Sequence, residues 1–354
     1  MAMKTTKKIE PRTKPLDACP VCGNEDTKFF FSSPDRLHGV PGEFSYDICN
    51  SCESVFQNPM VIQEDLHLCY PTDYMPYTYD PEMAYVDFES DNGGVREKLR
   101  NAVVKTVWGE PNGGICGAIG SFLAKNKKIR ERAFYGLVLD ECLPRSRGKD
   151  SALDVGCGAG WMLKRLAKVG WQVEGIEWNE SAAEIARQRT GQKVWAGDFR
   201  EIELPKEKYK LIYLSHVFEH FNDPLRALRR FYQLLSANGR LVMVFPNANS
   251  TDAHWFGADW FAWEVPRHLI LSSPKSIFTL AKACGYVNAR VRTRVADHLW
   301  TSSEAYRQER NPEQEHPDLS VLEKMGLLYQ QSAVSMGSLV GSELIIILEK
   351  PGRK

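Results

Sequence analysis

The sequence predicts an α/β protein in which helices cover both faces of a mostly parallel, seven-stranded sheet, preceded by a small module that binds a metal. From residue 151 onward, apolar strand-like runs alternate with helical patterns, which is typical of right-handed crossovers in a doubly wound sheet. The strand-like runs are continuously apolar, as expected of parallel strands buried on both faces. Two C-x-x-C pairs lie within the first 58 residues and predict the separate module.

Length, charge and cysteine content narrow the class of protein. The chain of 354 residues is long enough for one large domain and one small one. Its 45 basic and 45 acidic side chains give a formal net charge of zero, which disfavours a nucleic-acid partner. The sequence contains no apolar run of about 18 residues, so we expect no membrane span. The nine cysteines, an odd number, are typical of a reducing compartment, and we expect a cytoplasmic protein. The sequence does not indicate an oligomeric state.

The N-terminal part divides into a tail and a cysteine-rich module. Residues 1–16 are basic and lack the apolar segment of a signal peptide, which predicts a disordered tail. Residues 17–58 contain short strand-like pieces separated by proline and glycine. Two C-x-x-C turns bring four thiolates together, and this ligand set favours tetrahedral zinc without an open position, hence a structural ion. The predicted ligands are Cys19, Cys22, Cys49 and Cys52.

Residues 59–148 predict a connector between the module and the sheet. The first part is rich in tyrosine and proline, and the second has mostly helical patterns up to the boundary "PRSRGKD". The tyrosines are Tyr70, Tyr74, Tyr77 and Tyr79. Either they close the active site, with Tyr74 and Tyr77 binding substrate, or they pack as part of a surface connector.

Residues 149–354 predict the main domain. The expected strands are "SALDVG", "WQVEGIE", "KVWAG", "YKLIYLS", "GRLVMVFP", "YVNARVRTRV" and "SELIIILEK". The expected helices are "GWMLKRLAKVG", "NESAAEIARQRT", "DPLRALRRFYQLLS" and "SPKSIFTLAKACG". A polar stretch without an assigned element separates the last two strands.

The stretch "LDVGCGAG" after the first of these strands predicts a cofactor-binding turn. Gly156, Gly158 and Gly160 allow the backbone to approach a ligand and to turn into a helix. The turn is not G-x-G-x-x-G, because position 161 is tryptophan. Asp154 places a carboxylate beside the site, and a carboxylate repels a pyrophosphate but attracts an ammonium or sulfonium group.

Acidic side chains after the next two strands extend this prediction. Glu177 ends the second strand, where an acid accepts hydrogen bonds from both ribose hydroxyls, and Trp178 follows it. Asp198 and Phe199 follow the third strand, where an acid can bind an adenine amine and an aromatic side chain can cover the ring. An adenosine with a cationic tail and no phosphate is S-adenosylmethionine.

The motifs "LDVGCGAG", "GIEWN" and "AGDF" resemble the glycine-rich, ribose and adenine motifs of class I S-adenosylmethionine-dependent methyltransferases. The resemblance extends over roughly residues 150–350 in order and spacing. It implies a Rossmann-like fold whose last strand is antiparallel and inserted beside the fifth. The alternative to an S-adenosylmethionine-binding domain is a dinucleotide-binding enzyme.

The fourth predicted strand ends in "LSHVFEHFNDP", which resembles the H-x-x-E-H stretch of the small-molecule members of this family. Ser215 and His216 are expected beside the cofactor, because strand carboxyl ends face the ligand crevice. His216 and His220 share one face of a helical turn with Glu219 adjacent. Three roles stay open: a histidine as general base, a divalent metal held by the Glu–His pair, or shaping of the pocket.

A long segment after the fifth strand, residues 247–272, predicts a lid over the active site. Its candidate side chains, which suit a planar or sugar substrate and an anionic group, are His254, Trp255, Trp260, Trp263, Arg267 and His268. We expect His254, Trp255, Trp260 and Arg267 to bind substrate, and His268 to be a further candidate base. The alternative is a structural lid with its own aromatic core.

A cysteine module before such a domain resembles two groups of methyltransferases. One acts on nucleotide-linked deoxysugars, but this chain lacks the long C-terminal domain of that group. The other modifies guanine in ribosomal RNA, but this chain differs in its neutral charge and aromatic lid. We therefore predict methyl transfer to a small-molecule or glycan acceptor. An RNA base methyltransferase and a non-catalytic S-adenosylmethionine-binding partner protein remain the alternatives.

Overall fold

The protein was analysed as a computed structural model that carries all side chains of the residues it describes. The described residues are 8–70, 94–108, 112–126, 129–130, 133, 146, 148, 150–168, 170–310 and 319–352. Tyr74, Tyr77 and Tyr79 lie outside this set. None of the helices within the described ranges is long and apolar enough to cross a membrane.

The main domain is built on a seven-stranded sheet in the order β12-β13-β10-β9-β6-β7-β8. Its strands are β6 (Ser151–Val155), β7 (Gln172–Glu177), β8 (Lys193–Ala196), β9 (Tyr209–Ser215), β10 (Leu235–Pro246), β12 (Val287–Arg294) and β13 (Glu343–Glu349). Only β13 runs antiparallel to its neighbours, and it lies between β10 and β12. The predicted doubly wound sheet with an antiparallel last strand beside the fifth is confirmed.

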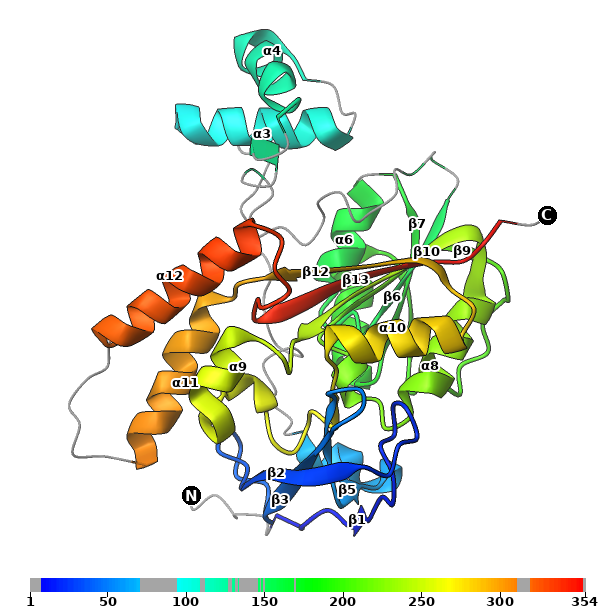
Figure 1. The fold of residues 1–354 in the computed structure, drawn as a ribbon. Coiled ribbons are helices and arrows are strands. Elements are labelled where there is room, and N and C mark those ends of the chain that lie inside the picture. Colours follow the sequence, from blue (N-terminus) through cyan, green and yellow to red (C-terminus); the bar gives the residue numbers. More distant parts are fainter. Residues whose placement is uncertain are drawn as a thin grey trace, which may run out of the picture.

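Helices cover both faces of this sheet because successive strand residues point to opposite sides. Leu153 and Ile212 pack on one face with the core that includes Phe231 of α8, whereas Ala152 and Leu211 pack on the other with α6 and α7. The covering helices are α6 (Trp161–Lys168), α7 (Glu180–Thr190), α8 (Pro224–Leu234) and α10 (Pro274–Ala283). Figure 1 shows α8 and α10 on the side of the sheet that also holds the N-terminal module.

The N-terminal module, here called the ribbon (residues 17–58), is not independent of the main domain. Its strands and those beside it are β1 (Thr13–Lys14), β2 (Thr27–Ser33), β3 (Phe44–Cys49), β4 (Val55–Gln57) and β5 (Met60–Val61). The strand β11 (Ile270–Leu271), which belongs to the lid, joins β4, β3 and β2 in a sheet of order β11-β4-β3-β2, while β1 and β5 pair with each other. Ile270 pairs with Phe56 and Leu271 with Val55. Ribbon and lid therefore form one continuous structure (Figure 1).

The remaining elements lie around this framework. They are η1 (Gln63–Cys69), α3 (Val95–Trp108), α4 (Gly114–Leu123), η2 (Phe218–His220), α9 (Thr251–Phe256), η3 (Gly257–Asp259) and η4 (Phe261–Trp263). In Figure 1, α3 and α4 pack on each other on the side of the main domain opposite the ribbon.

The stretch between β12 and β13, which the sequence left without an element, contains two helices: α11 (Asp297–Arg310) and α12 (Val321–Ser335). The reason for the miss is visible in α12, whose buried residues include Glu323 and Gln330. Gln330 accepts a hydrogen bond from the Trp300 indole at 2.7 Å and donates to Asp252 at 2.6 Å. A helix that buries polar side chains does not show the apolar periodicity from which helices are predicted.

Candidate functional site

The glycine turn after β6 packs directly on the segment that carries the histidines. Gly156, Gly158 and Gly160 all have positive φ angles, of 71°, 50° and 90°. A Cβ atom on Gly156 would lie 2.2 Å from Cγ2 of Val217, so a larger residue does not fit. The predicted cofactor turn and the H-x-x-E-H segment are therefore immediate neighbours at the carboxyl end of the sheet.

Asp154 lies beneath this turn and is 2% exposed. Among the described residues, its Oδ2 atom has no hydrogen-bond partner. Burial, and secondarily the charge of Glu177, raise the pKa of Asp154 to about 8. A buried carboxyl group without a donor is the environment that an incoming cationic group would stabilise.

Glu177 ends β7 and reaches back to the turn. Its Oε2 accepts a hydrogen bond from the Gly158 N–H at 2.8 Å, and its Oε1 accepts one from Asn179 N–H at 3.0 Å. Burial raises the pKa of Glu177. The two acids and the turn thus form one unit, while the neighbouring Trp178 is 45% exposed.

Asp198 and Phe199 occupy different environments. Asp198 pairs with Arg200, whose Nε lies 2.9 Å from Oδ1. Burial opposes ionisation of Asp198, but its hydrogen bonds and ion pair with Arg200 outweigh this effect and lower its pKa. Phe199 is 4% exposed and stacks on Phe231 with ring centroids 4.8 Å apart. This packing corrects the expectation that its ring covers the adenine: Phe199 belongs to the core beneath α8.

Ser215 ends β9, and His216 follows it in a left-handed conformation with φ 53°. The His216 Nε2 lies 2.9 Å from Oε1 of Glu343, and Nδ1 lies 3.5 Å from Oε1 of Glu219. Desolvation opposes protonation, but the two nearby carboxylates outweigh it and raise the pKa of His216 to about 10. A raised pKa favours the protonated ring, which is not the form that a general base needs, and the predicted role of His216 as a base stays a prediction.

Glu219, His220 and His268 form the centre of the site. Glu219 is 0% exposed, and within the described part of the chain neither of its carboxylate oxygens has a hydrogen bond. His268 Nε2 lies 3.7 Å from Glu219 Oε1, and the two imidazole rings meet edge to face with centroids 4.8 Å apart. One ligand atom from each of the three residues lies within 4.8 Å of the others. Burial lowers the pKa of His268 and keeps its ring neutral.

Two of the lid residues predicted to bind substrate are instead buried in its structure. Trp260 is 1% exposed, and its indole N–H donates to Asp252 Oδ2 at 2.9 Å. Arg267 is 0% exposed, and its guanidinium binds both oxygens of Asp35 in the ribbon, at 3.0 and 3.1 Å. Because their polar atoms are occupied within the protein, both side chains support the alternative of a structural lid.

The other two lid residues predicted to bind substrate are exposed to solvent. His254 is exposed, and its Nδ1 lies 2.8 Å from the Ser250 carbonyl. Trp255 is 41% exposed and tilts against Trp300 with centroids 5.9 Å apart. These two side chains are free to contact a substrate and keep their predicted role as a proposal.

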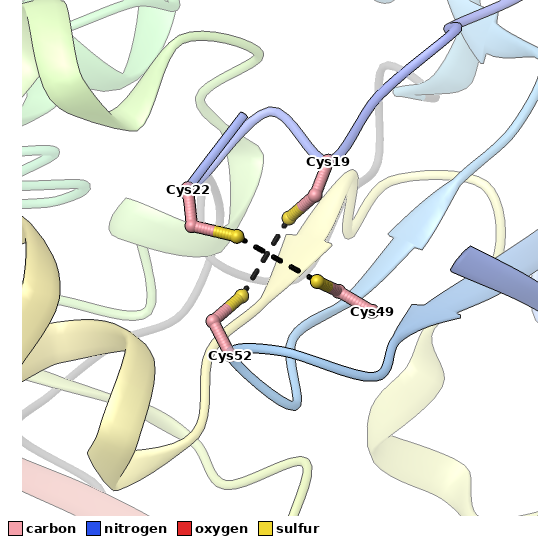
Figure 2. Close-up of side chains that lie close together, drawn as sticks. All are labelled: Cys19, Cys22, Cys49 and Cys52. Atoms are coloured by element: carbon pink, nitrogen blue, oxygen red, sulfur yellow. Dashed lines mark hydrogen bonds between the residues drawn. The ribbon is translucent and has the colours of Figure 1, made fainter. Parts of the chain in front are cut away.

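The four cysteines of the ribbon converge as the sequence predicted (Figure 2). The sulfur of Cys19 lies 3.6 Å from that of Cys52, and the sulfur of Cys22 lies 3.6 Å from that of Cys49. A tetrahedron with Zn–S bonds of about 2.3 Å has S···S edges of about 3.8 Å. The donor atoms therefore fit a four-thiolate zinc ion with no open position.

Sequence reasoning missed three residues that shape the site, and named a fourth, Tyr70, only as a member of the tyrosine cluster. Asp35 holds Arg267, and Glu343, the first residue of β13, holds His216. Glu264, in a left-handed conformation with φ 38°, lies 3.4 Å from His268 Nε2. The Tyr70 hydroxyl lies 2.9 Å from His220 Nδ1, and only its place in the tyrosine cluster pointed to it. The other three are single acids without a motif.

Comparison with known proteins finds a similarity over part of the chain. Residues 124–291 match the family described as "Methyltransferase domain". The ubiquinone biosynthesis O-methyltransferase of Histophilus somni (strain 2336) is 30% identical over 129 residues, which cover 32% of this chain and 53% of that protein. An uncharacterized 37.1 kDa protein in transposon TN4556 of Streptomyces fradiae is 33% identical over 126 residues, covering 34% of this chain and 36% of that protein. The chain thus spans about half or less of the length of these relatives.

A solved S-adenosylmethionine-dependent methyltransferase from Archaeoglobus fulgidus superposes with a TM-score of 0.43 at 15% identity, covering 67% of this chain and 100% of that one. The family match includes the glycine turn, and the seven-stranded sheet has the predicted Rossmann-like strand order. Over residues 124–291 the chain is similar to the methyltransferase domain family.

Proposed function

We propose that this protein transfers the methyl group of S-adenosylmethionine to a small-molecule or glycan acceptor, with an oxygen as the most suitable acceptor atom. The observation that carries the proposal is the cluster of Glu219, His220 and His268 beside the glycine turn, in which Glu219 and His268 are buried. The relatives described as ubiquinone biosynthesis O-methyltransferases support an oxygen acceptor.

The cofactor side of the site fits S-adenosylmethionine. Asp154 has a buried carboxyl oxygen without a donor, which suits the cationic amino-acid end of the cofactor. Glu177 has lone pairs beyond the two that its backbone donors use, which suits the ribose hydroxyls. Asp198 would accept from the adenine amine. The bound cofactor supplies an electrophilic methyl group, and the chain's own task is to align an acceptor with it and to exclude water.

The acceptor side supplies the groups that receive a proton. A hydroxyl acceptor must lose its proton as the new bond to carbon forms. His268 is neutral, and Glu219 is a carboxylate without a hydrogen bond, so the cluster can accept that proton. The protonated His216 stands beside it and compensates the charge of Glu219 and Glu343. His254 and Trp255 would contact the acceptor from the lid.

The ribbon, in this proposal, carries a structural zinc ion and completes the wall of the site. Its four sulfur atoms fit tetrahedral zinc, and its strand β4 pairs with β11 directly after His268. The Tyr46 hydroxyl donates to the His268 carbonyl at 2.9 Å. The ribbon thereby fixes the backbone on which His268 stands.

Calorimetry with S-adenosylmethionine and S-adenosylhomocysteine tests the cofactor, and a methyl-transfer screen against nucleotide sugars, glycans, phenolic hydroxyls and RNA tests the acceptor. We expect both cofactor forms to bind and a hydroxyl compound to be methylated. Binding of neither form contradicts the proposal. Methylation of RNA, with salt-dependent retention, would instead establish the RNA alternative. Binding without turnover on any acceptor would favour a non-catalytic partner protein.

A further inference from the structure

We propose that Glu219, His220 and His268 bind a divalent transition-metal ion, separate from the ion expected at the four cysteines. This inference goes beyond the proposed function and is testable without any methyl acceptor. It rests on the donor atoms of three residues from two distant parts of the chain, η2 and the lid, which lie within 4.8 Å of one another.

The hydrogen bonds of both rings fix which nitrogen is available. His268 Nδ1 lies 2.8 Å from the Ala262 carbonyl, and His220 Nδ1 lies 2.9 Å from the Arg267 carbonyl. A carbonyl oxygen only accepts, so Nδ1 of both rings carries a hydrogen, and a ring with one hydrogen has its lone pair on Nε2. Metal-binding histidines show this arrangement, in which a backbone carbonyl orients the ring from the second nitrogen.

The carboxylate that faces these rings is the second, independent observation. Glu219 is 0% exposed, and neither of its oxygens has a hydrogen bond among the described residues. Its neighbours His220 and His268 both direct acceptors rather than donors toward the cluster. Three acceptors, of which Glu219 and His268 are buried, converge here, and the nearest cationic group, His216, lies 3.5 Å from one Glu219 oxygen without a hydrogen bond. A cation at the centre satisfies all three.

The distances fit such an ion. A tetrahedral ion with bonds of about 2.1 Å places its donor atoms about 3.4 Å apart, and His268 Nε2 lies 3.7 Å from Glu219 Oε1. Glu264 Oε2, 3.4 Å from the same His268 nitrogen, is within reach as a fourth ligand. Two imidazoles and one buried carboxylate favour Zn²⁺, Co²⁺ or Fe²⁺ over Mg²⁺ or Ca²⁺, which prefer oxygen ligands.

The position gives the ion a role. With Glu219 and the two histidines as ligands and Glu264 held by its ion pair with Arg267, a further coordination position stays open. The Glu219 segment adjoins the cofactor turn through Val217. With the ion bound, His268 Nε2 no longer accepts a proton. An acceptor hydroxyl on the ion would instead pass its proton to the Glu219 oxygen that does not bind the ion, and would be held in line with the methyl group. This role, unlike the metal binding itself, rests on the proposed function.

Metal stoichiometry of the full chain tests the inference. The purified protein is incubated with Zn²⁺ or Co²⁺, desalted, and its metal measured by plasma mass spectrometry. We expect two ions per wild-type chain and one in Glu219→Gln and His268→Gln. His254→Gln, which alters a lid histidine outside the cluster, should keep two. With Co²⁺, the ion lost in the cluster variants should lack the thiolate charge-transfer absorption that marks the cysteine site.

Several results would overturn the inference. One ion per wild-type chain, with thiolate absorption, leaves no metal for the cluster, whatever the variants do. Two ions in Glu219→Gln and His268→Gln place the second ion elsewhere. Retention of Mg²⁺ but not of Co²⁺ or Zn²⁺ contradicts the class of ion. Methyl transfer by a protein with one ion would sustain the proposed function while removing the metal, so the two proposals fail separately.

Discussion

The two sides of the candidate site are built in different ways. The cofactor side comes from one contiguous stretch, in which Asp154, Glu177 and Asp198 stand at the ends of neighbouring parallel strands. The opposite side joins the ribbon to the lid across a large sequence separation, 232 residues for the contact between Asp35 and Arg267. The first is a local arrangement repeated along a sheet, and the second exists only after the tertiary structure has formed.

The two sides are therefore stabilised by different interactions. The cofactor side relies on backbone conformations that glycine permits and on strand ends that the sheet fixes. The ribbon and lid side relies on a buried ion pair, a sheet completed by β11, and a cysteine cluster. Changes to the second side should therefore remove the acceptor wall and leave the cofactor side in place.

The largest expected effect comes from removing a cysteine ligand. Cys49→Ser should cost the chain one equivalent of zinc and unfold the ribbon, because metal binding in such modules contributes on the order of 10 kcal/mol. We expect S-adenosylmethionine affinity, measured by calorimetry, to stay within about tenfold of wild type, since Gly156 and Glu177 stand on the other side. Cys284→Ser, outside the cluster, should change neither quantity. Loss of both zinc and cofactor binding in Cys49→Ser would show that the two sides fold as one unit.

The next largest effect is expected for Asp35→Asn. Arg267 is 0% exposed and would keep only its second ion-pair partner, Glu264. Loss of the pair with Asp35 should therefore cost about 3 kcal/mol of unfolding free energy, the low end for a broken buried pair. The matched control is Asp65→Asn, which breaks a pair with Arg12, whose side chain is 70% exposed, and should cost much less than Asp35→Asn because solvent screens the pair. Urea unfolding measures both, and equal costs would contradict the structural role of the buried pair.

The same pair predicts a pH dependence. Burial disfavours the charged form of Asp35, but the hydrogen bonds and charge of Arg267 outweigh it and lower its pKa. The pair's stabilisation is thus present above the ordinary aspartate value of about 3.9 and is lost as pH falls toward the depressed pKa. Wild-type stability should fall more steeply than that of Asp35→Asn as pH decreases below about 4.

The comparison also explains what the sequence predicts well. The sheet is predicted strand by strand, because apolar runs such as that of β9 are dictated by burial on both faces. The cofactor turn is predicted because Gly156 and Asp154 follow a strand at fixed spacing. The cysteine cluster is predicted because two C-x-x-C pairs have one common geometric solution.

What the sequence does not predict depends on distant partners. Arg267 in an aromatic lid suggests a ligand for an anion, and only the fold shows that Asp35 occupies it. Phe199 stands at an adenine motif, but α8 supplies Phe231 to pack on it. The helix α12 is not predicted because it buries the polar residue Gln330, whose partners Trp300 and Asp252 lie far away in sequence. In each case the partner, not the residue itself, decides the role.

A smaller effect, on the cofactor side alone, is expected from protonation of Asp154. Burial and Glu177 raise its pKa to about 8 in the protein without cofactor, and a bound cation would favour the ionised form. Binding S-adenosylmethionine should therefore release a proton, and affinity should weaken by up to tenfold for each pH unit below 8. Calorimetry in buffers of different ionisation enthalpy measures the proton directly. Asp154→Asn should abolish both the release and the pH dependence, and a wild-type affinity that is flat from pH 6 to 8 would exclude this role.

The smallest effect is expected where the two sides meet, at Tyr70. Its hydroxyl lies 2.9 Å from Nδ1 of His220, which also contacts the Arg267 carbonyl. Because that nitrogen keeps its second partner, Tyr70→Phe should cost only about 0.5–1.5 kcal/mol, a factor of roughly 2–10 in turnover. We expect kcat for the acceptor found in the screen to fall while S-adenosylmethionine affinity is unchanged. Tyr329→Phe, on the exposed face of α12, is the control and should alter neither. A fall in cofactor affinity in Tyr70→Phe would mean that Tyr70 acts on the cofactor side. His220 would then contribute to both sides of the site, and the proposed division between them would be wrong.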